Sequence, residues 1–88
     1  MSHPLGALAD NMAAYAIYAT AQTEMRRAYA LIDAGELDAA ANEIESAAHA
    51  AEVLAKASTE LDRIAHWRRV ADARQRFVDQ LKAERVAA

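Results

Sequence analysis

The stretch that decides the fold is Asp33-Ala34-Gly35-Glu36-Leu37, which holds the only glycine of the chain apart from Gly6. Glycine adopts the left-handed conformation at the ends of helices more readily than any other residue. We therefore predict Gly35 as a structural turn between two helices. The single proline, Pro4, stands close to the first residue, and good helix formers fill most of the sequence on both sides of the turn.

Working outward from this turn, apolar residues recur every three or four positions, as on one face of a helix. We expect one helical domain over residues 1–88, with helices at about 5–33, 36–56 and 59–86. The predicted fold class is all-α: an antiparallel three-helix bundle, or an extended αα-hairpin with a long first helix. The second break rests on the hydroxyls of Ser58 and Thr59, which are followed by Asp62 in an N-capping pattern. One helix over residues 37–86 is the alternative.

Each predicted helix has a different inner stripe. The second helix has an alanine-rich stripe, and small residues let two helices approach closely. Arginines interrupt the stripe of the third helix. The inner stripe expected for the first helix carries larger side chains: Leu8, Met12, Tyr15, Ala19, Gln22, Met25, Tyr29 and Ile32.

Length and composition favour self-association. A domain of 88 residues is small, and much of its 55% hydrophobic content is alanine, which buries little area per side chain.

There is no cysteine, no apolar run near the roughly 20 residues of a membrane span, and no signal-like pattern in the first residues. These features predict a cytoplasmic protein with no membrane partner, and the alanine- and arginine-rich composition favours a bacterial or phage origin.

Charge is distributed unevenly along the chain. Residues 35–62 are mostly acidic and residues 63–88 mostly basic, whereas Asn11 to Thr23 carry no charge. We expect the acidic and basic helices to neutralise each other, within one chain or between copies. The competing interpretation is that the arginines bind phosphates beside a stacking Trp67. The net charge of −3 weighs against a nucleic-acid partner.

The uncharged part of the first helix is the predicted contact surface. A helix without charges on any side is usually covered on more than one side, and tyrosine and methionine are enriched in interfaces. A protein partner, either a second copy or another protein, is therefore expected. The candidate interface residues are Met12, Tyr15, Ile17, Tyr18, Gln22 and Met25.

Two histidine-containing groups are candidates for a chemical site. Glu45, His49 and Glu52 share a helix face, a spacing that is compatible with a metal site. His66 follows Asp62 by four residues, as in an orienting acid–base pair. The first group matches no metal motif, and no cysteine nucleophile or glycine-rich phosphate loop accompanies the second. We predict no catalytic residues, no metal, no cofactor and no enzymatic activity.

The residues around the turn resemble a helical hairpin of the tetratricopeptide type. Small, large and glycine residues occur at spacings similar to those of that repeat: Ala28, Leu31, Gly35, Ala40, Ile44 and Ala47. Three-helix domains of the microtubule-interacting-and-transport type have a similar corner. The resemblance implies an αα-hairpin with a protein-binding role, and it assigns no binding residues.

The function expected from the sequence is therefore a non-catalytic protein–protein interaction module that self-associates through its first helix. Two alternatives remain open. One is a small inhibitor or regulatory subunit, of phage origin for example, whose acidic second helix occupies a larger protein. The other is a nucleic-acid-associated protein that uses the basic third helix.

Overall fold

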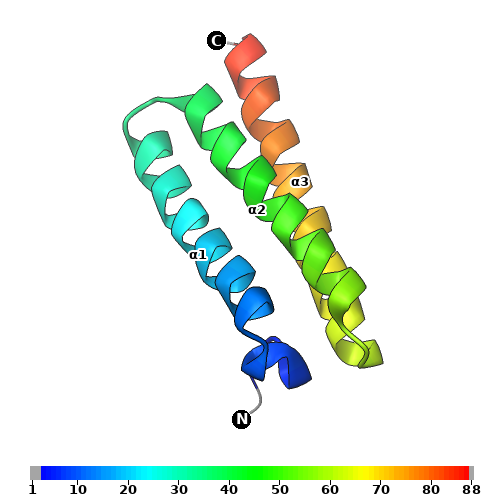
Figure 1. Cartoon of the computed structure of the whole chain (residues 1–88). Coiled ribbons are helices and arrows are strands. Elements are labelled where there is room, and N and C mark those ends of the chain that lie inside the picture. Colours follow the sequence, from blue (N-terminus) through cyan, green and yellow to red (C-terminus); the bar gives the residue numbers. More distant parts are fainter. Residues whose placement is uncertain (1–2, 88) are drawn as a thin grey trace.

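A computed structural model describes residues 3–87, so both ends of the predicted domain, residues 1–2 and 88, lie outside the described residues. The all-α class with three helices is confirmed, and no strand occurs over residues 3–87. The molecule is elongated, 44 × 21 × 20 Å (Figure 1). The helical segments are a short 3₁₀ segment η1 (Gly6–Asp10), α1 (Met12–Asp33), α2 (Leu37–Ala57) and α3 (Leu61–Ala87).

The first helix begins later than predicted. We expected it from about residue 5, but the chain is extended at Asn11 and α1 starts at Met12. The Asn11 side chain accepts a hydrogen bond from the Ala14 backbone N–H at 3.0 Å. Asparagine satisfies the first free N–H groups of a helix well, so a new helix begins here and the segment before it bends away.

The segment before α1 covers one end of the bundle. Leu5 is fully buried against the core, and the Ala7 N–H donates to the Glu60 carboxylate at 2.8 Å. Gly6 has a positive φ of 58°, and a Cβ atom there would collide with Glu60. The glycine therefore lets η1 lie directly on the turn between α2 and α3.

The turn at Gly35 is a Schellman motif. Gly35 has φ of 78°. Its N–H donates to the carbonyl of Ile32 at 3.0 Å, and the Glu36 N–H donates to the carbonyl of Leu31 at 2.8 Å. These bonds satisfy carbonyls that the end of α1 would otherwise leave free. A side chain at Gly35 would meet no atom within 4 Å, so only the backbone conformation restricts this position.

The second break separates α2 from α3, so the alternative of a single helix over residues 37–86 is wrong. Ser58 is extended and buried, and its hydroxyl donates to the Leu54 carbonyl at 2.7 Å. Ser58 thus ends α2, whereas we had expected a hydroxyl cap at the start of the third helix. That helix begins at Leu61, two residues later than predicted.

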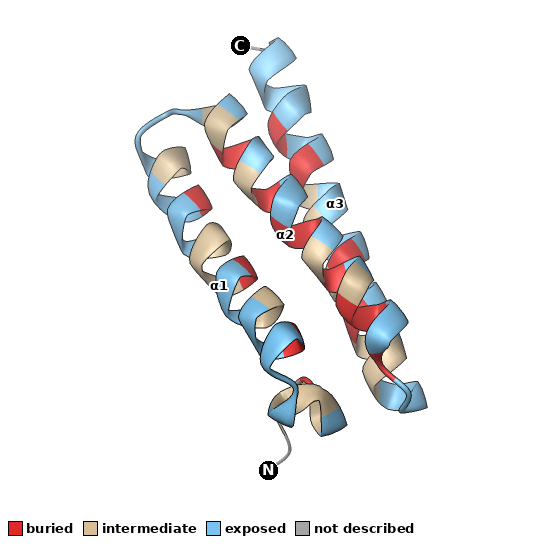
Figure 2. Ribbon diagram, viewed as in Figure 1, coloured by how far each residue is buried: buried red, intermediate tan, exposed pale blue. Residues whose placement is uncertain are grey.

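Helix α2 lies between the other two helices. Its buried face is red along its length in Figure 2 and consists mainly of alanines. The backbones of α1 and α3 each come close to α2 and only sparsely to each other. Large side chains bridge α1 and α3 instead: the rings of Tyr18 and Trp67 lie 6.0 Å apart and those of Tyr29 and Phe77 6.1 Å apart.

The inner stripe predicted for the first helix is wrong. Met12 is 88% exposed, and Tyr15 and Tyr29 are 46% and 54% exposed. The buried residues of α1 are instead Ala14, Ala21 and Ala28, each seven residues after the last. Alanine on α1 meets alanine on α2, which brings the two helices together closely and turns the larger side chains toward the edges of α1.

Candidate interaction surface

The outward face of α1 is uncharged and uncovered. Asn11 to Thr23 contain no charged residue, and this part of the helix exposes most of its outward side chains. The exposed positions are Asn11, Met12, Ala13, Tyr15, Ala16, Ala19 and Thr20. Three of them, Met12, Ala16 and Ala19, continue to Thr23 and Arg26 with alternating spacings of four and three residues. This spacing defines one continuous seam along the outside of the helix.

The six predicted interface residues divide among three places. Met12 and Tyr15 are exposed at the start of α1, whereas Ile17 and Tyr18 are half-buried and pack against the core. The Tyr18 ring contacts the ring of Tyr15 at 5.9 Å and that of His3 at 5.2 Å, both edge-on. These rings form a small aromatic cluster where α1 begins.

The other two predicted residues line a groove between α1 and α3. The groove has a volume of about 440 Å³. Met25 and Tyr29 contribute from α1, and Val70 contributes from α3. The complete lining is Gln22, Met25, Arg26, Tyr29, Val70, Ala73 and Arg74. The groove exists because the two helix backbones stay apart, so half-buried apolar side chains remain accessible along it.

Arg74 crosses the interior of the bundle from this groove. Its Nη1 donates to the carbonyl oxygen of Ala47 on α2 at 2.8 Å. Burial lowers the pKa of the Arg74 guanidinium, and the nearby Tyr29 and Glu24 partly oppose that effect. Arginine stays protonated in proteins, so this side chain places a half-buried positive charge at the base of the groove.

His66 lies in the same positive environment. Its ring contacts that of Trp67 at 4.8 Å. Partial burial and the guanidinium groups of Arg69, Arg63 and Arg74 lower the pKa of the His66 imidazole. The imidazole is therefore neutral at pH 7. Asp62, four residues before His66, does not contribute to this shift of the pKa.

Ion pairs join α2 to both of its neighbours. Arg85 pairs with Asp38 at 2.8 Å and Lys82 with Glu45 at 3.8 Å, both between α3 and α2. From α1, Arg27 pairs with Glu43 at 3.2 Å. Three other arginines of α3, Arg68, Arg69 and Arg76, are exposed, and over residues 3–87 none of them has a carboxylate within 4.0 Å.

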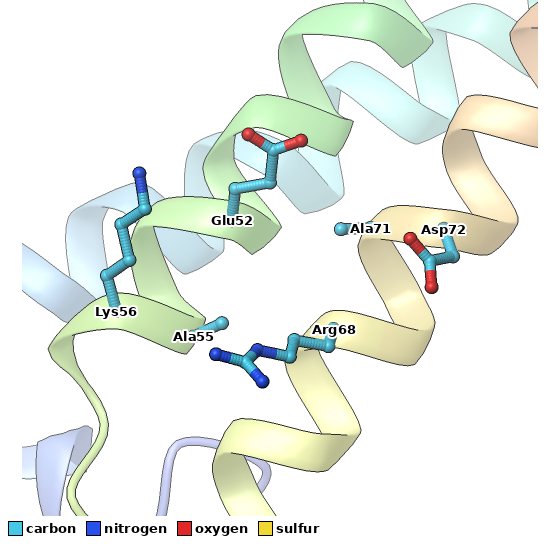
Figure 3. A pocket seen from close by; sticks show the side chains of 6 residues that line it. All are labelled: Glu52, Ala55, Lys56, Arg68, Ala71 and Asp72. Carbon is cyan, nitrogen blue, oxygen red and sulfur yellow. The ribbon is translucent and has the colours of Figure 1, made fainter.

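A shallow pocket lies on the opposite side of α3 (Figure 3). Its volume is about 240 Å³, and Ala55 and Ala71 form its apolar part. Around them stand Glu52 and Lys56 from α2 and Arg68 and Asp72 from α3, of which Arg68 extends toward Ala55. Two cations and two carboxylates stand around a pocket too open to exclude water, an arrangement without a preferred ligand charge.

The face of Glu45, His49 and Glu52 does not converge into a metal site. His49 Nδ1 lies 4.0 Å from the Glu52 carboxylate, whereas Glu45 is turned toward Lys82. No group of three potential ligands close enough to hold a metal ion occurs in the part of the chain that the structure describes. In the same part, no helix is long and apolar enough to cross a membrane.

No family model, curated protein or solved structure matches this chain. The resemblance to tetratricopeptide-type and microtubule-interacting-and-transport-type hairpins therefore stays a prediction.

Proposed function

We propose that this chain is a non-catalytic protein–protein interaction module that self-associates through α1. The observation that carries the proposal is the outward face of α1, which is uncharged from Asn11 to Thr23 and exposed at its outward positions from Asn11 to Thr20. A helix at the edge of a soluble bundle normally presents charged residues to water. An exposed uncharged face together with half-exposed aromatic residues is typical of a surface that another protein covers.

The positions of the side chains decide which variants test this proposal. Ile17 and Tyr18 pack against the core, so a charge there would destabilise the fold as well as any contact. Ala16 is exposed on α1 and is the cleaner position. Ala16→Glu should dissociate the oligomer without loss of helicity, and Ala83→Glu, at an exposed position of α3, should not.

Light scattering coupled to gel filtration over a range of protein concentrations measures both variants and the parent chain. We expect the parent chain and Ala83→Glu to show the same concentration-dependent mass, and Ala16→Glu to remain monomeric. A parent chain that stays monomeric at every accessible concentration would contradict self-association.

A nucleic-acid-binding role is the second candidate, and one observation favours it. Arg68, Arg69 and Arg76 are exposed on α3 and, among residues 3–87, unpaired with any carboxylate. Binding through these residues should weaken steeply as salt increases, because each phosphate contact releases counterions. A role for α2 as an acidic inhibitory helix has less support, because Asp38, Glu43 and Glu45 already form ion pairs within the chain.

A further inference from the structure

Opposite charges border the uncharged face of α1. Asp10 stands immediately before it, and Arg26 continues its seam at the other end; both are exposed. Neither forms an ion pair within residues 3–87. Among the described residues, Arg26 donates only to the Thr23 hydroxyl, at 3.1 Å. The neighbouring Arg27 is already paired with Glu43. The face therefore ends in one available negative charge and one available positive charge.

This arrangement is complementary to itself in only one direction. If two copies packed α1 against α1 in parallel, Asp10 would face Asp10 and Arg26 would face Arg26. In the antiparallel direction, a two-fold axis near residue 18 places Asp10 of each copy opposite Arg26 of the other. Asp10 ends η1 just before α1 begins, and the helix rises about 21 Å from Met12 to Arg26 at 1.5 Å per residue. Both pairs can therefore form at once, well separated at the two ends of the contact.

The side chains near the axis permit the close approach that such pairing needs. Ala16 and Ala19 lie on the seam on either side of residue 18, and both are exposed. Alanine pairs at a helix crossing allow interaxial distances near the lower end of the usual range of about 8–10 Å. Tyr15 stands beside them, about half exposed, and would contact the second copy at the edge of the crossing.

We propose that α1 pairs with α1 of a second copy in an antiparallel, two-fold symmetric contact, in which Asp10 of each copy meets Arg26 of the other. This inference rests on the proposed function and specifies its geometry. Isologous contacts of this kind close on themselves and give dimers, not filaments. The complementary charges set the direction and register of the pairing, whereas the uncharged face between them contributes most of the buried area.

Charge reversal tests the register. Arg26→Glu alone and Asp10→Lys alone each place like charges together at both ends of the dimer, and each should raise the dissociation constant about tenfold at low salt. The combined variant restores both pairs with reversed sign and should recover most of the affinity. Arg76→Glu makes the same charge change on exposed α3 and should leave the dissociation constant unchanged. Sedimentation equilibrium measures all five proteins, and circular dichroism checks that each is folded.

Single cysteines test the direction independently, because the chain contains none. Under mild oxidation, Ala19→Cys lies near the axis and should cross-link to itself, whereas Met12→Cys should not. A mixture of Met12→Cys and Thr23→Cys should form the mixed disulfide. In a parallel dimer, Met12→Cys would cross-link to itself as readily as Ala19→Cys.

The outcomes separate this inference from the function on which it rests. If the double charge variant is no tighter than the single variants, or if Met12→Cys cross-links to itself, the antiparallel register is wrong. Self-association through α1 then stands on the effect of Ala16→Glu. If the parent chain is a monomer, both proposals are wrong.

Discussion

Helices α1 and α2 both pack through alanine inside the bundle, but they differ in how many of their larger side chains they bury. Helix α2 is covered on two sides and buries Ile44 and Leu54 together with its alanines. Helix α1 is covered on one side, buries only three alanines, and leaves Met12, Tyr15 and Tyr29 largely or partly exposed. A central helix can bury its larger side chains, whereas an edge helix that packs through alanine must leave them at its margins. The apolar surface that α1 leaves exposed is the physical basis of the proposed contact.

The largest effect is expected from filling an alanine site on the central helix. Ala51 is fully buried between the helices, so Ala51→Leu should force them apart and lower the free energy of unfolding by about 2–3 kcal/mol. Ala16→Leu adds the same atoms to the exposed side of α1 and should change stability by less than about 0.5 kcal/mol. Urea unfolding measured at a concentration where the protein is monomeric gives both values. Equal losses would mean that α1 is covered on its outward side within the monomer.

The same contrast explains how much the sequence predicts. The alanine face of α2 is correctly predicted, because Ile44 and Leu54 mark its direction among the alanines. The inner face of α1 is not, because an apolar stripe of Met12, Tyr15 and Tyr29 is the stronger signal by hydrophobicity. The signal that places the face correctly is the seven-residue repeat of Ala14, Ala21 and Ala28, which has meaning only once the partner is known to be another alanine face.

Other features of the surface depend on contacts between distant residues. The groove between α1 and α3 requires that the two backbones stay apart, and Arg74 reaches a carbonyl 27 residues away on α2. Local sequence patterns contain no information about either. The start of α1, in contrast, had a readable signal in Asn11, a strong N-capping residue. That signal was outweighed by the helix-forming residues on both sides of it.

A smaller effect is expected at the corner that sets α1 against α2. Gly35→Val places a β-branched side chain in the left-handed conformation and should cost more than about 1 kcal/mol. Gly35→Asn should be milder, because asparagine tolerates that conformation. The site is open, so the difference between the two variants reports the backbone alone. Thermal unfolding measures both variants. Equal midpoints would mean that the left-handed conformation at residue 35 does not limit stability.

The two helices also differ in how they begin. The Asn11 side chain caps α1, whereas Glu36 before α2 makes no capping hydrogen bond with its side chain. Asn11→Ala should therefore lower the free energy of unfolding by about 1 kcal/mol. Glu36→Ala should lower it by only a few tenths of a kcal/mol, through the lost interaction with the helix dipole. Chemical unfolding at pH 7 measures both variants. A larger loss of stability for Glu36→Ala than for Asn11→Ala would mean that Glu36, and not Asn11, is the more important capping residue.

The smallest effect expected is the change of melting temperature with added salt. Whether salt lowers or raises the melting temperature distinguishes two functions for α3. The three ion pairs that join α2 to its neighbours lie at the surface. Each surface ion pair contributes about 0–1 kcal/mol to the free energy of unfolding, and salt screens this contribution. Raising sodium chloride from low to moderate concentration should therefore lower the melting temperature by a few degrees at most. The measurement needs only the parent chain, and the triple variant Arg27→Gln, Lys82→Gln, Arg85→Gln is the control that should lose this dependence.

A melting temperature that rises with added salt would favour a different function for α3. If repulsion among its exposed arginines outweighed the ion pairs with α2, added salt would screen that repulsion and raise the melting temperature. Arg68→Ala combined with Arg69→Ala would then also raise it, and would abolish any binding to nucleic acid. We expect the first sign, because Asp72 and Asp79 lie among these arginines and the chain as a whole is acidic. A melt at two salt concentrations thus distinguishes a helix neutralised by its own neighbours from one that presents its charge to a phosphate backbone.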